Sequence, residues 1–363
     1  MKTMKLAMKF VRQSTGIALV ALLLPCVILA QYTRTDLVSN TGVSPNPPDP
    51  NLVNGWGLVS LATSPYWVSN NGTGTSTLYT STGQKMALTV AIPSAGGSAA
   101  PGQPTGIVGN TAADPNAFVV SEGGISGKAF FIFATFDGTI SGWNPQVGGA
   151  GAGAHATIGR DRSGFGAVYT GLAIGVNGMQ NLLYAADDGP NRRIDVFDSQ
   201  FNVVEPSPNA FTDPKIPKEF APYGIQNIHG DIWVTYTALN KGQGGFVDRF
   251  GADGTLKQHF AVHGPLHSPW GLAQAPSDFG PMSNAILVSN NIPRGRINAF
   301  DSTTGSFLGP LRDASGNPIE IDDVWALQFG QDGGPNGAHN QLFFTAGPNN
   351  YANGLFGVIA FTQ

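Results

Sequence analysis

The sequence contains a single cysteine, Cys26, among its 363 residues. A disulfide bond within the chain is therefore excluded, and stability has to come from packing. Charged residues make up only 12% of the chain, and no long amphipathic helical pattern is present. What the chain does contain is 49 glycines and 26 prolines, which interrupt short apolar runs. This combination predicts many short strands joined by turns.

A basic and apolar leader occupies the first thirty residues. Four basic residues precede the short apolar segment 16–24, and Ala30 ends a pattern typical of a cleavage site. These features predict a signal peptide over residues 1–30 and a secreted or periplasmic protein. Because a proline directly precedes Cys26, a lipid anchor fits less well, and it stays an alternative together with an uncleaved anchor.

The mature chain, residues 31–363, is acidic. Cleavage of the leader removes four of the 19 lysines and arginines but none of the 23 acidic residues. This balance argues against nucleic acid and anionic membrane surfaces as partners. No later segment is long and apolar enough to span a membrane. We expect a monomer whose partner is a small molecule, a glycan or an envelope protein.

Three short patterns recur in fixed order along the mature chain. The first is an apolar strand centred on glycine (alanine in the last copy), the second an apolar run ending in polar residues, and the third an apolar-x-x-aromatic strand. Six copies begin roughly 50 residues apart, which suits one four-stranded blade each. The first patterns start at Asn54, Pro104, Tyr169, Pro222, Pro269 and Val324.

These repeats predict an all-β fold, a six-bladed β-propeller in a single domain over residues 31–363. The sixth copy stops at its third strand, near Phe361, whereas residues 31–38 form a strand with no blade of its own. We therefore predict that this N-terminal strand joins the C-terminal blade and closes the ring.

The repeat sequences resemble those of NHL-type propellers, especially at residues 184–187 and 193–198. From about Thr35 to Phe361 the chain also resembles a family of exported bacterial propeller proteins, through stretches such as 137–145 and 210–214. The resemblance implies the fold and export, and it supplies no activity. It also marks Phe136, because the family usually carries an acid there.

Alignment of the copies predicts which residues meet at one mouth of the central channel, where first strands start and second strands end. Four aromatic residues share one position of the first strand, namely Trp56, Tyr223, Trp270 and Trp325. Two positions earlier stand the polar residues Asn54 and Asp323. The second strands end in Asn70, Glu122, Asp187 and Asn290.

The polar residues of this mouth have two interpretations. Glu122, Asp187 and Asp323, with the three asparagines, could hold Ca²⁺ or another hard divalent cation. Six-bladed lactonases and related esterases use a comparable set of ligands, which is an analogy only. The alternative is turn chemistry, because Asn and Asp often close hairpins by bonding to their own backbone. No cofactor is required by the sequence.

The aromatic residues also have two interpretations. They could form a stacking platform for a sugar or a planar ligand, or they could fill the channel and pack between blades. Three histidines, His259, His263 and His267, do not predict a metal site, because residues four apart on a strand are about 13 Å apart.

These features favour an exported binding or scaffold propeller that acts through one face of the ring. The alternative is a metal-dependent hydrolase or lyase at the channel mouth, with His267 as its base. Whether the protein is an enzyme stays open at the level of the sequence.

Overall fold

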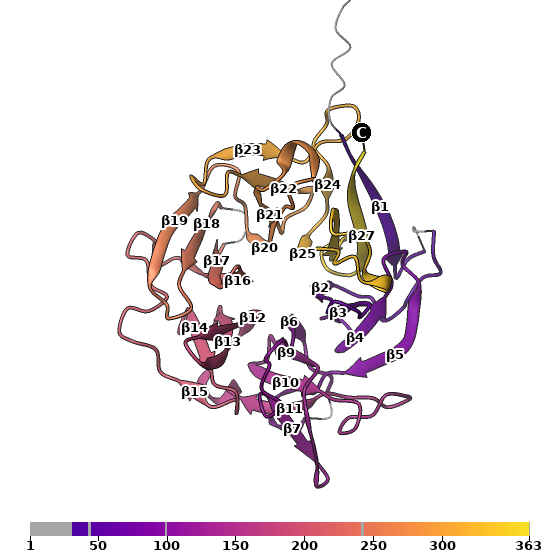
Figure 1. Ribbon diagram of the computed structural model, residues 1–363, viewed down its shortest axis with the longest axis vertical. Coiled ribbons are helices and arrows are strands. Elements are labelled where there is room, and N and C mark those ends of the chain that lie inside the picture. The colour runs from indigo at the N-terminus through magenta and orange to yellow at the C-terminus, as the bar shows by residue number, and fades with distance from the viewer. Residues whose placement is uncertain (1–30, 43–44, 99, 241–242, 363) are drawn as a thin grey trace, which may run out of the picture.

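The computed structural model describes residues 31–42, 45–98, 100–240 and 243–362. The predicted signal peptide lies outside these ranges. Within them the chain forms six sheets arranged in a ring around a central axis (Figure 1). The predicted six-bladed propeller is therefore confirmed.

The first three blades follow one another along the chain, and each is an antiparallel sheet whose strands run in order from the axis outward. Blade 1 contains β2 (Gly55–Val59), β3 (Tyr66–Asn70), β4 (Thr75–Tyr79) and β5 (Lys85–Ala91). Blade 2 contains β6 (Pro104–Gly109), β9 (Phe131–Thr135), β10 (Thr139–Trp143) and β11 (Thr157–Asp161). Blade 3 contains β12 (Tyr169–Asn177), β13 (Gln180–Asp187), β14 (Arg193–Phe197) and β15 (Val203–Val204).

The last three blades complete the ring. Blade 4 contains β16 (Phe220–Ile228), β17 (Asp231–Ala238), β18 (Gly245–Phe250) and β19 (Leu256–Val262). Blade 5 contains β20 (Pro269–Gln274), β21 (Ile286–Asn290), β22 (Gly295–Phe300) and β23 (Phe307–Pro310), and β24 (Glu320–Ile321) also pairs with β22. Blade 6 contains β25 (Val324–Phe329), β26 (Gln341–Ala346), β27 (Leu355–Thr362) and β1 (Gln31–Ser39).

In the residues that the structure describes, helix is confined to single turns in loops: η1 (Ala95–Gly97), η2 (Ser163–Phe165), η3 (Gly280–Met282) and η4 (Gly334–Asn336). Across the described ranges, no helix has the length and apolar character needed to cross a membrane.

The N-terminal strand closes the ring, as predicted. β1 pairs antiparallel with β27 along its whole length, and Gln31 lies opposite Thr362. Buried Tyr32 ties this strand to blade 5, because its hydroxyl donates to the main-chain oxygen of Phe279 at 2.7 Å and accepts from the Met282 N–H at 3.1 Å. The outer edge of β27, which a chain without β1 would expose, is thereby hydrogen-bonded.

The hydrophobic core lies between the blades. Six clusters of buried apolar residues are found in the described part of the chain, one for each pair of neighbouring blades. Between blades 1 and 2, for example, Trp67 stacks on Phe131 with ring centroids 4.1 Å apart. Both faces of each blade are thus buried, which explains why the strands read as nearly continuous apolar runs.

One predicted strand is wrong. The apolar pattern places the second strand of blade 2 at residues 118–122, but Val119–Glu122 is β7, which pairs with β8 (Ile125–Lys128) in a separate hairpin. Figure 1 shows β7 at the outer rim, beyond β11. The true second strand is β9, in which Thr135 lies opposite Pro104. Both segments are apolar runs of similar length, so pairing distant in sequence decides between them.

Candidate functional site at the channel mouth

Four aromatic residues meet on the axis, where the inner strands begin. Trp56 and Trp325 stack with ring centroids 3.8 Å apart, and Trp270 meets Trp325 edge-on at 5.9 Å. Tyr223 lies edge-on to Trp56 at 6.5 Å. Each of the four is at most 8% exposed. These residues, which we call the aromatic plug, fill the channel in the way that the packing interpretation describes, and their faces are covered mainly by one another.

Within the described residues, two of the three indole N–H groups of the plug donate hydrogen bonds, and the third does not. Trp270 Nε1 donates to the main-chain oxygen of Thr170, and Trp325 Nε1 donates to Asn54 Oδ1, both at 2.9 Å. Trp56 Nε1 is buried and has no acceptor among the described residues. Among these three indoles, Trp56 is thus the one whose N–H lacks an acceptor in the described part of the chain.

The residues before the inner strands do reach this mouth. Asn54 and Asp323 both have a left-handed backbone, with φ of 48° and 51°, which Asn and Asp tolerate better than most residues. Their carbonyl oxygens accept hydrogen bonds from the residue that follows the second strand, Asn71 at 3.2 Å and Gly347 at 3.0 Å. The same bond joins equivalent residues in three other blades, namely Phe136 to Gln103, Asp188 to Val168 and Asn291 to Ser268.

This repeated bond identifies which residues line the mouth. They are those one position after the second strand, including Asn71, Phe136, Asp188 and Asn291, and not the predicted residues that end it. The reason is the alternation of side chains along a strand, which turns successive residues to opposite sides. In blades 1, 3 and 5 the predicted residues Asn70, Asp187 and Asn290 therefore stand one position before the residues that face the mouth.

Two of the predicted asparagines bond within their own blade. Asn70 Nδ2 donates to Thr77 Oγ1 at 2.9 Å on the neighbouring strand β4. Asn290 Nδ2 donates to the main-chain oxygen of Pro265 at 2.7 Å, and its Oδ1 accepts from the His267 N–H. Both side chains are buried and support loops and hairpins.

At the end of its own strand, Asp187 accepts hydrogen bonds from main-chain N–H groups. Its Oδ1 accepts from the N–H groups of Val168 at 2.8 Å and Gly189 at 2.9 Å. Burial raises the pKa of the Asp187 carboxyl above its ordinary value, although these two N–H groups act in the opposite direction. The turn interpretation accounts for Oδ1 of this carboxylate, whereas Oδ2 is buried without a donor in the described ranges.

Glu122 lies away from the mouth, on the outer hairpin, where its carboxylate is 2.7 Å from His155 Nε2. This hydrogen bond lowers the pKa of Glu122 and raises that of His155. The structure does not bring Glu122, Asp187 and Asp323 together. In the described ranges, the one group of three acidic or histidine residues close enough to hold an ion is Asp213, Asp248 and His259.

Asn291 is the central polar residue of the observed mouth. Its Oδ1 accepts from the hydroxyls of Tyr351 at 2.9 Å and Tyr223 at 3.4 Å. Burial, together with the charges of Tyr351, Asp188 and Asp323, raises the pKa of Tyr223 well above its ordinary value. Two amide nitrogens at this mouth, Asn71 Nδ2 and Asn291 Nδ2, are buried and have no acceptor in the described part of the chain.

Phe136 gives the mouth an exposed apolar surface. Its side chain is 40% exposed, and its ring centroid lies 6.2 Å from that of Trp56. In the sequence, Phe136 is marked only by the family resemblance, because the predicted second strand of blade 2 ends elsewhere.

His267 does not lie at the channel mouth. It lines a cavity of about 560 Å³ at blade 5, together with Arg294, Arg296 and Asn290. His263 packs against Phe246 with ring centroids 4.4 Å apart. His259 also packs against Phe246, and its Nδ1 lies beside Asp213 and Asp248.

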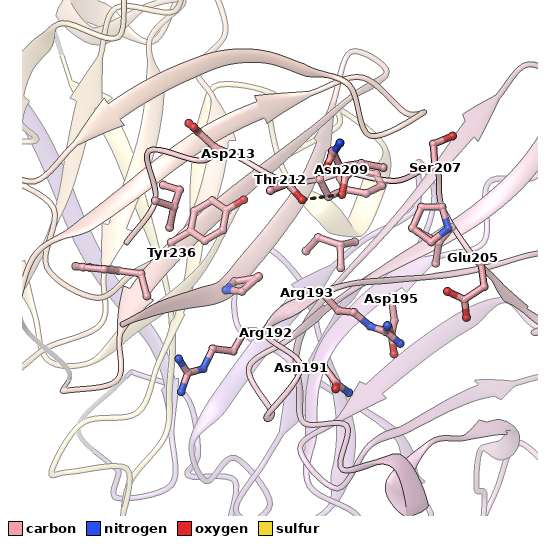
Figure 2. A pocket seen from close by; sticks show the side chains of 18 of the residues that line it. Asn191, Arg192, Arg193, Asp195, Glu205, Ser207, Asn209, Thr212, Asp213 and Tyr236 are labelled. Carbon is pink, nitrogen blue, oxygen red and sulfur yellow. Dashed lines mark hydrogen bonds and ion pairs between the residues drawn. The ribbon is translucent and has the colours of Figure 1, made fainter. Parts of the chain in front are cut away.

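Another group of polar residues lies between blades 3 and 4. A cavity of about 530 Å³ there is lined by Asp195, Asp213, Tyr236 and neighbouring residues (Figure 2). Sequence reasoning missed this region, although Asp213 lies in the stretch 210–214 that carries the family resemblance.

The fold and its closure define the class of the protein, a six-bladed β-propeller. A streptogramin B lyase structure covers 91% of this chain and 98% of its own, with a TM-score of 0.51 at 11% identity. At that identity the likeness concerns the fold alone.

The chain belongs to the same family as uncharacterized protein L690 of Acanthamoeba polyphaga mimivirus. The two are 32% identical over 348 residues, which is 92% of this chain and 87% of the viral protein. Uncharacterized protein R648 of the same virus is 30% identical over 90% of this chain and 80% of its own. No family model matches the chain, so membership of the exported bacterial family stays a prediction.

Proposed function

We propose that this protein is an exported binding propeller that takes a polyhydroxylated small molecule, such as a sugar, at the channel mouth around Trp56 and Phe136. One observation carries the proposal: Trp56 Nε1, Asn71 Nδ2 and Asn291 Nδ2 are buried donors without acceptors among the described residues. A buried donor without a partner costs about 1–3 kcal/mol. Ligand oxygens, or waters that a ligand displaces, are the groups that remove this cost.

The remaining groups of the mouth suit hydroxyl groups. Asp323 and Asp188 contribute negative charge beside Tyr223, and carboxylates in general accept hydrogen bonds from hydroxyl groups. A sugar hydroxyl both donates and accepts, so it can satisfy amide donors and carboxylate acceptors together. The exposed ring of Phe136 offers an apolar face for the C–H groups of the same ligand.

The metal-dependent hydrolase or lyase has less support at this mouth. It needs several predicted ligands to share one ion, calcium or another divalent cation. However, Asn70 and Asn290 bond within their own blades, and Glu122 lies on the outer hairpin. We therefore propose binding rather than metal-dependent catalysis at this mouth.

Binding is tested by titrating the purified protein with glucose, N-acetylglucosamine and galacturonic acid while recording tryptophan fluorescence. We expect a saturable change with at least one sugar, because Trp56 and Trp325 lie at the mouth. Phe136→Ala should weaken that response several-fold. Phe130→Ala is the matched control, since this ring is 47% exposed and packs near Trp143, outside the mouth. The absence of a saturable change with all three sugars would count against the proposal.

Export is the second part of the proposal. The predicted leader, residues 1–30, directly precedes the strand β1 (Gln31–Ser39), which pairs with β27 and closes the ring. Expression of the full chain in a bacterium, followed by N-terminal sequencing of the periplasmic and medium fractions, should give a mature chain that starts at Gln31. Recovery of the chain in the cytoplasm with Met1 intact would contradict export.

A further inference from the structure

Blade 4 carries a buried cluster of two carboxylates and one imidazole. Asp248 on β18 lies directly opposite His259 on β19, so the two side chains share one face of the sheet. Asp213 reaches the same place from the connection between β15 and β16. His259 Nδ1 is 2.6 Å from Asp213 Oδ2 and 2.9 Å from Asp248 Oδ1. One ring nitrogen thus faces two carboxylates.

The connection holds Asp213 firmly in this position. Asp213 Oδ1 accepts from the N–H of Lys215 at 2.8 Å, and its main-chain oxygen accepts from the N–H of Ile216 at 3.1 Å. Phe211, two residues earlier, packs against Phe250 of β18 with ring centroids 5.6 Å apart. Asp213 is therefore fixed by its loop before any ligand arrives, which lowers the entropy cost of binding.

The two carboxylates of the cluster lie close together in a poorly solvated place. Asp248 is fully buried and Asp213 is 6% exposed, so water screens their repulsion poorly. Burial and the charge of Asp213 raise the pKa of Asp248 to about 8, although the charge of Lys215 acts in the opposite direction. Asp248 Oδ2 also has no hydrogen-bond donor among the described residues. A divalent cation between the two carboxylates would remove their mutual repulsion.

Tyr236 provides an independent sign that a further group belongs at this cluster. Its side chain is 5% exposed, and its hydroxyl has no partner in the described part of the chain. Burial and the charges of Asp248 and Asp213 raise the pKa of Tyr236 well above its ordinary value. Tyr236 and Asp213 both line the 530 Å³ cavity between blades 3 and 4, as Figure 2 shows.

We infer that Asp213, Asp248 and His259 bind a divalent first-row transition metal ion such as Zn²⁺, beside the cavity that Tyr236 lines. One imidazole nitrogen and two carboxylate oxygens suit this class of ion, whereas Ca²⁺ takes six to eight oxygen ligands. Three protein ligands leave a coordination position for water or for an anionic ligand in the cavity. This site is separate from the channel mouth, so the proposal of a metal site does not depend on the proposed function.

The test is a metal titration of the full chain after treatment with EDTA. Calorimetric titration with ZnCl₂ should give one equivalent, and Co²⁺ should give visible absorption bands at the same stoichiometry. Zinc at about a hundred times its Kd should raise Tm by roughly 3–5 °C for a chain of this size. No binding heat and no cobalt bands in the wild-type protein would overturn the proposal.

Variants assign the binding to these residues. His259→Gln and Asp248→Asn should each abolish the stoichiometric binding. Asp248→Asn also removes a like charge, so the EDTA-treated variant should be at least as stable as the wild type, which separates lost binding from lost folding.

The matched control is His339→Gln. His339 lies on the surface between Asp332 at 2.7 Å and Asp278 at 3.1 Å, which contact different ring nitrogens. This variant should bind zinc like the wild type. Full binding in both His259→Gln and Asp248→Asn, with loss in His339→Gln, would show adventitious surface binding and overturn the proposal.

Discussion

At the residue scale, the alternation of side chains along the second strands decides which polar groups reach the channel. Asn290 ends β21 and bonds to Pro265 within blade 5, whereas Asn291 follows it and meets Tyr351 at the mouth. Neighbouring residues of the same type thus have different surroundings. A functional assignment by residue type alone would not separate them.

This difference has a measurable consequence for Asn290. Replacement of Asn290 with alanine removes the acceptor of the His267 N–H and one of the two donors to the Pro265 carbonyl, which keeps its bond from Asn298 Nδ2, so stability should fall by about 1–2 kcal/mol. Urea denaturation followed by circular dichroism measures the change. Asn116→Ala is the control, because Asn116 is exposed and should shift stability by less than about 0.5 kcal/mol. Equal effects of the two variants would show that Asn290 has no structural role.

The outer pair of Glu122 and His155 gives a prediction about pH. The hydrogen bond raises the pKa of His155 and lowers that of Glu122, so the pair stabilises the fold between the ordinary glutamate and histidine pKa values. This contribution is lost as pH rises through the raised histidine pKa or falls through the lowered glutamate pKa. The contribution is small, because both side chains are largely exposed. NMR titration of the His155 ring should show its pKa falling in Glu122→Gln. An unchanged pKa would mean that the pair does not form in solution.

At the scale of elements, β1 holds the ring closed through Tyr32. The ring of Tyr32 packs against Phe279 with centroids 4.8 Å apart, and its hydroxyl bonds across to blade 5. Tyr32→Ala should cost about 3–5 kcal/mol, whereas Tyr32→Phe keeps the packing and should cost about 1–2 kcal/mol. Thr33→Ala, on the exposed side of β1, is the control. A cost below about 0.5 kcal/mol for Tyr32→Ala would contradict this role.

The sequence predicts the inner strands and the closing strand well, because each carries a local signal. The glycine-centred pattern recurs in all six inner strands, with alanine in the last, and residues 31–38 are a strand with no other partner. The second strand of blade 2 is different. Val119–Glu122 and Phe131–Thr135 are similar apolar runs, and only the long-range pairing of β9 with β6 separates them.

The cluster in blade 4 could not be predicted from local patterns. Asp248 and His259 come together through the register of β18 and β19, and Asp213 joins them from a connection without regular structure. The sequence gives two local signals, the acid Asp248 within the mainly apolar segment of β18 and Asp213 in the stretch 210–214 that carries the family resemblance.

At the scale of the whole molecule, the ring depends on its two ends meeting in blade 6. A chain that begins after Ser39 would leave the outer edge of β27 unpaired. Such a chain should form oligomers through that edge, seen by size-exclusion chromatography. Addition of a peptide with the sequence of β1 should restore the monomer, and a scrambled peptide should not. A truncated chain that stays monomeric and equally stable would contradict closure by β1.

The central claim is that the channel mouth takes a polar ligand against the aromatic plug. The most direct measurement is a high-resolution crystal structure of the protein soaked with N-acetylglucosamine. The account predicts sugar density against Phe136, with oxygen atoms accepting from Trp56 Nε1 and Asn291 Nδ2. Ordered water alone at these donors, with no sugar at the mouth, would contradict it.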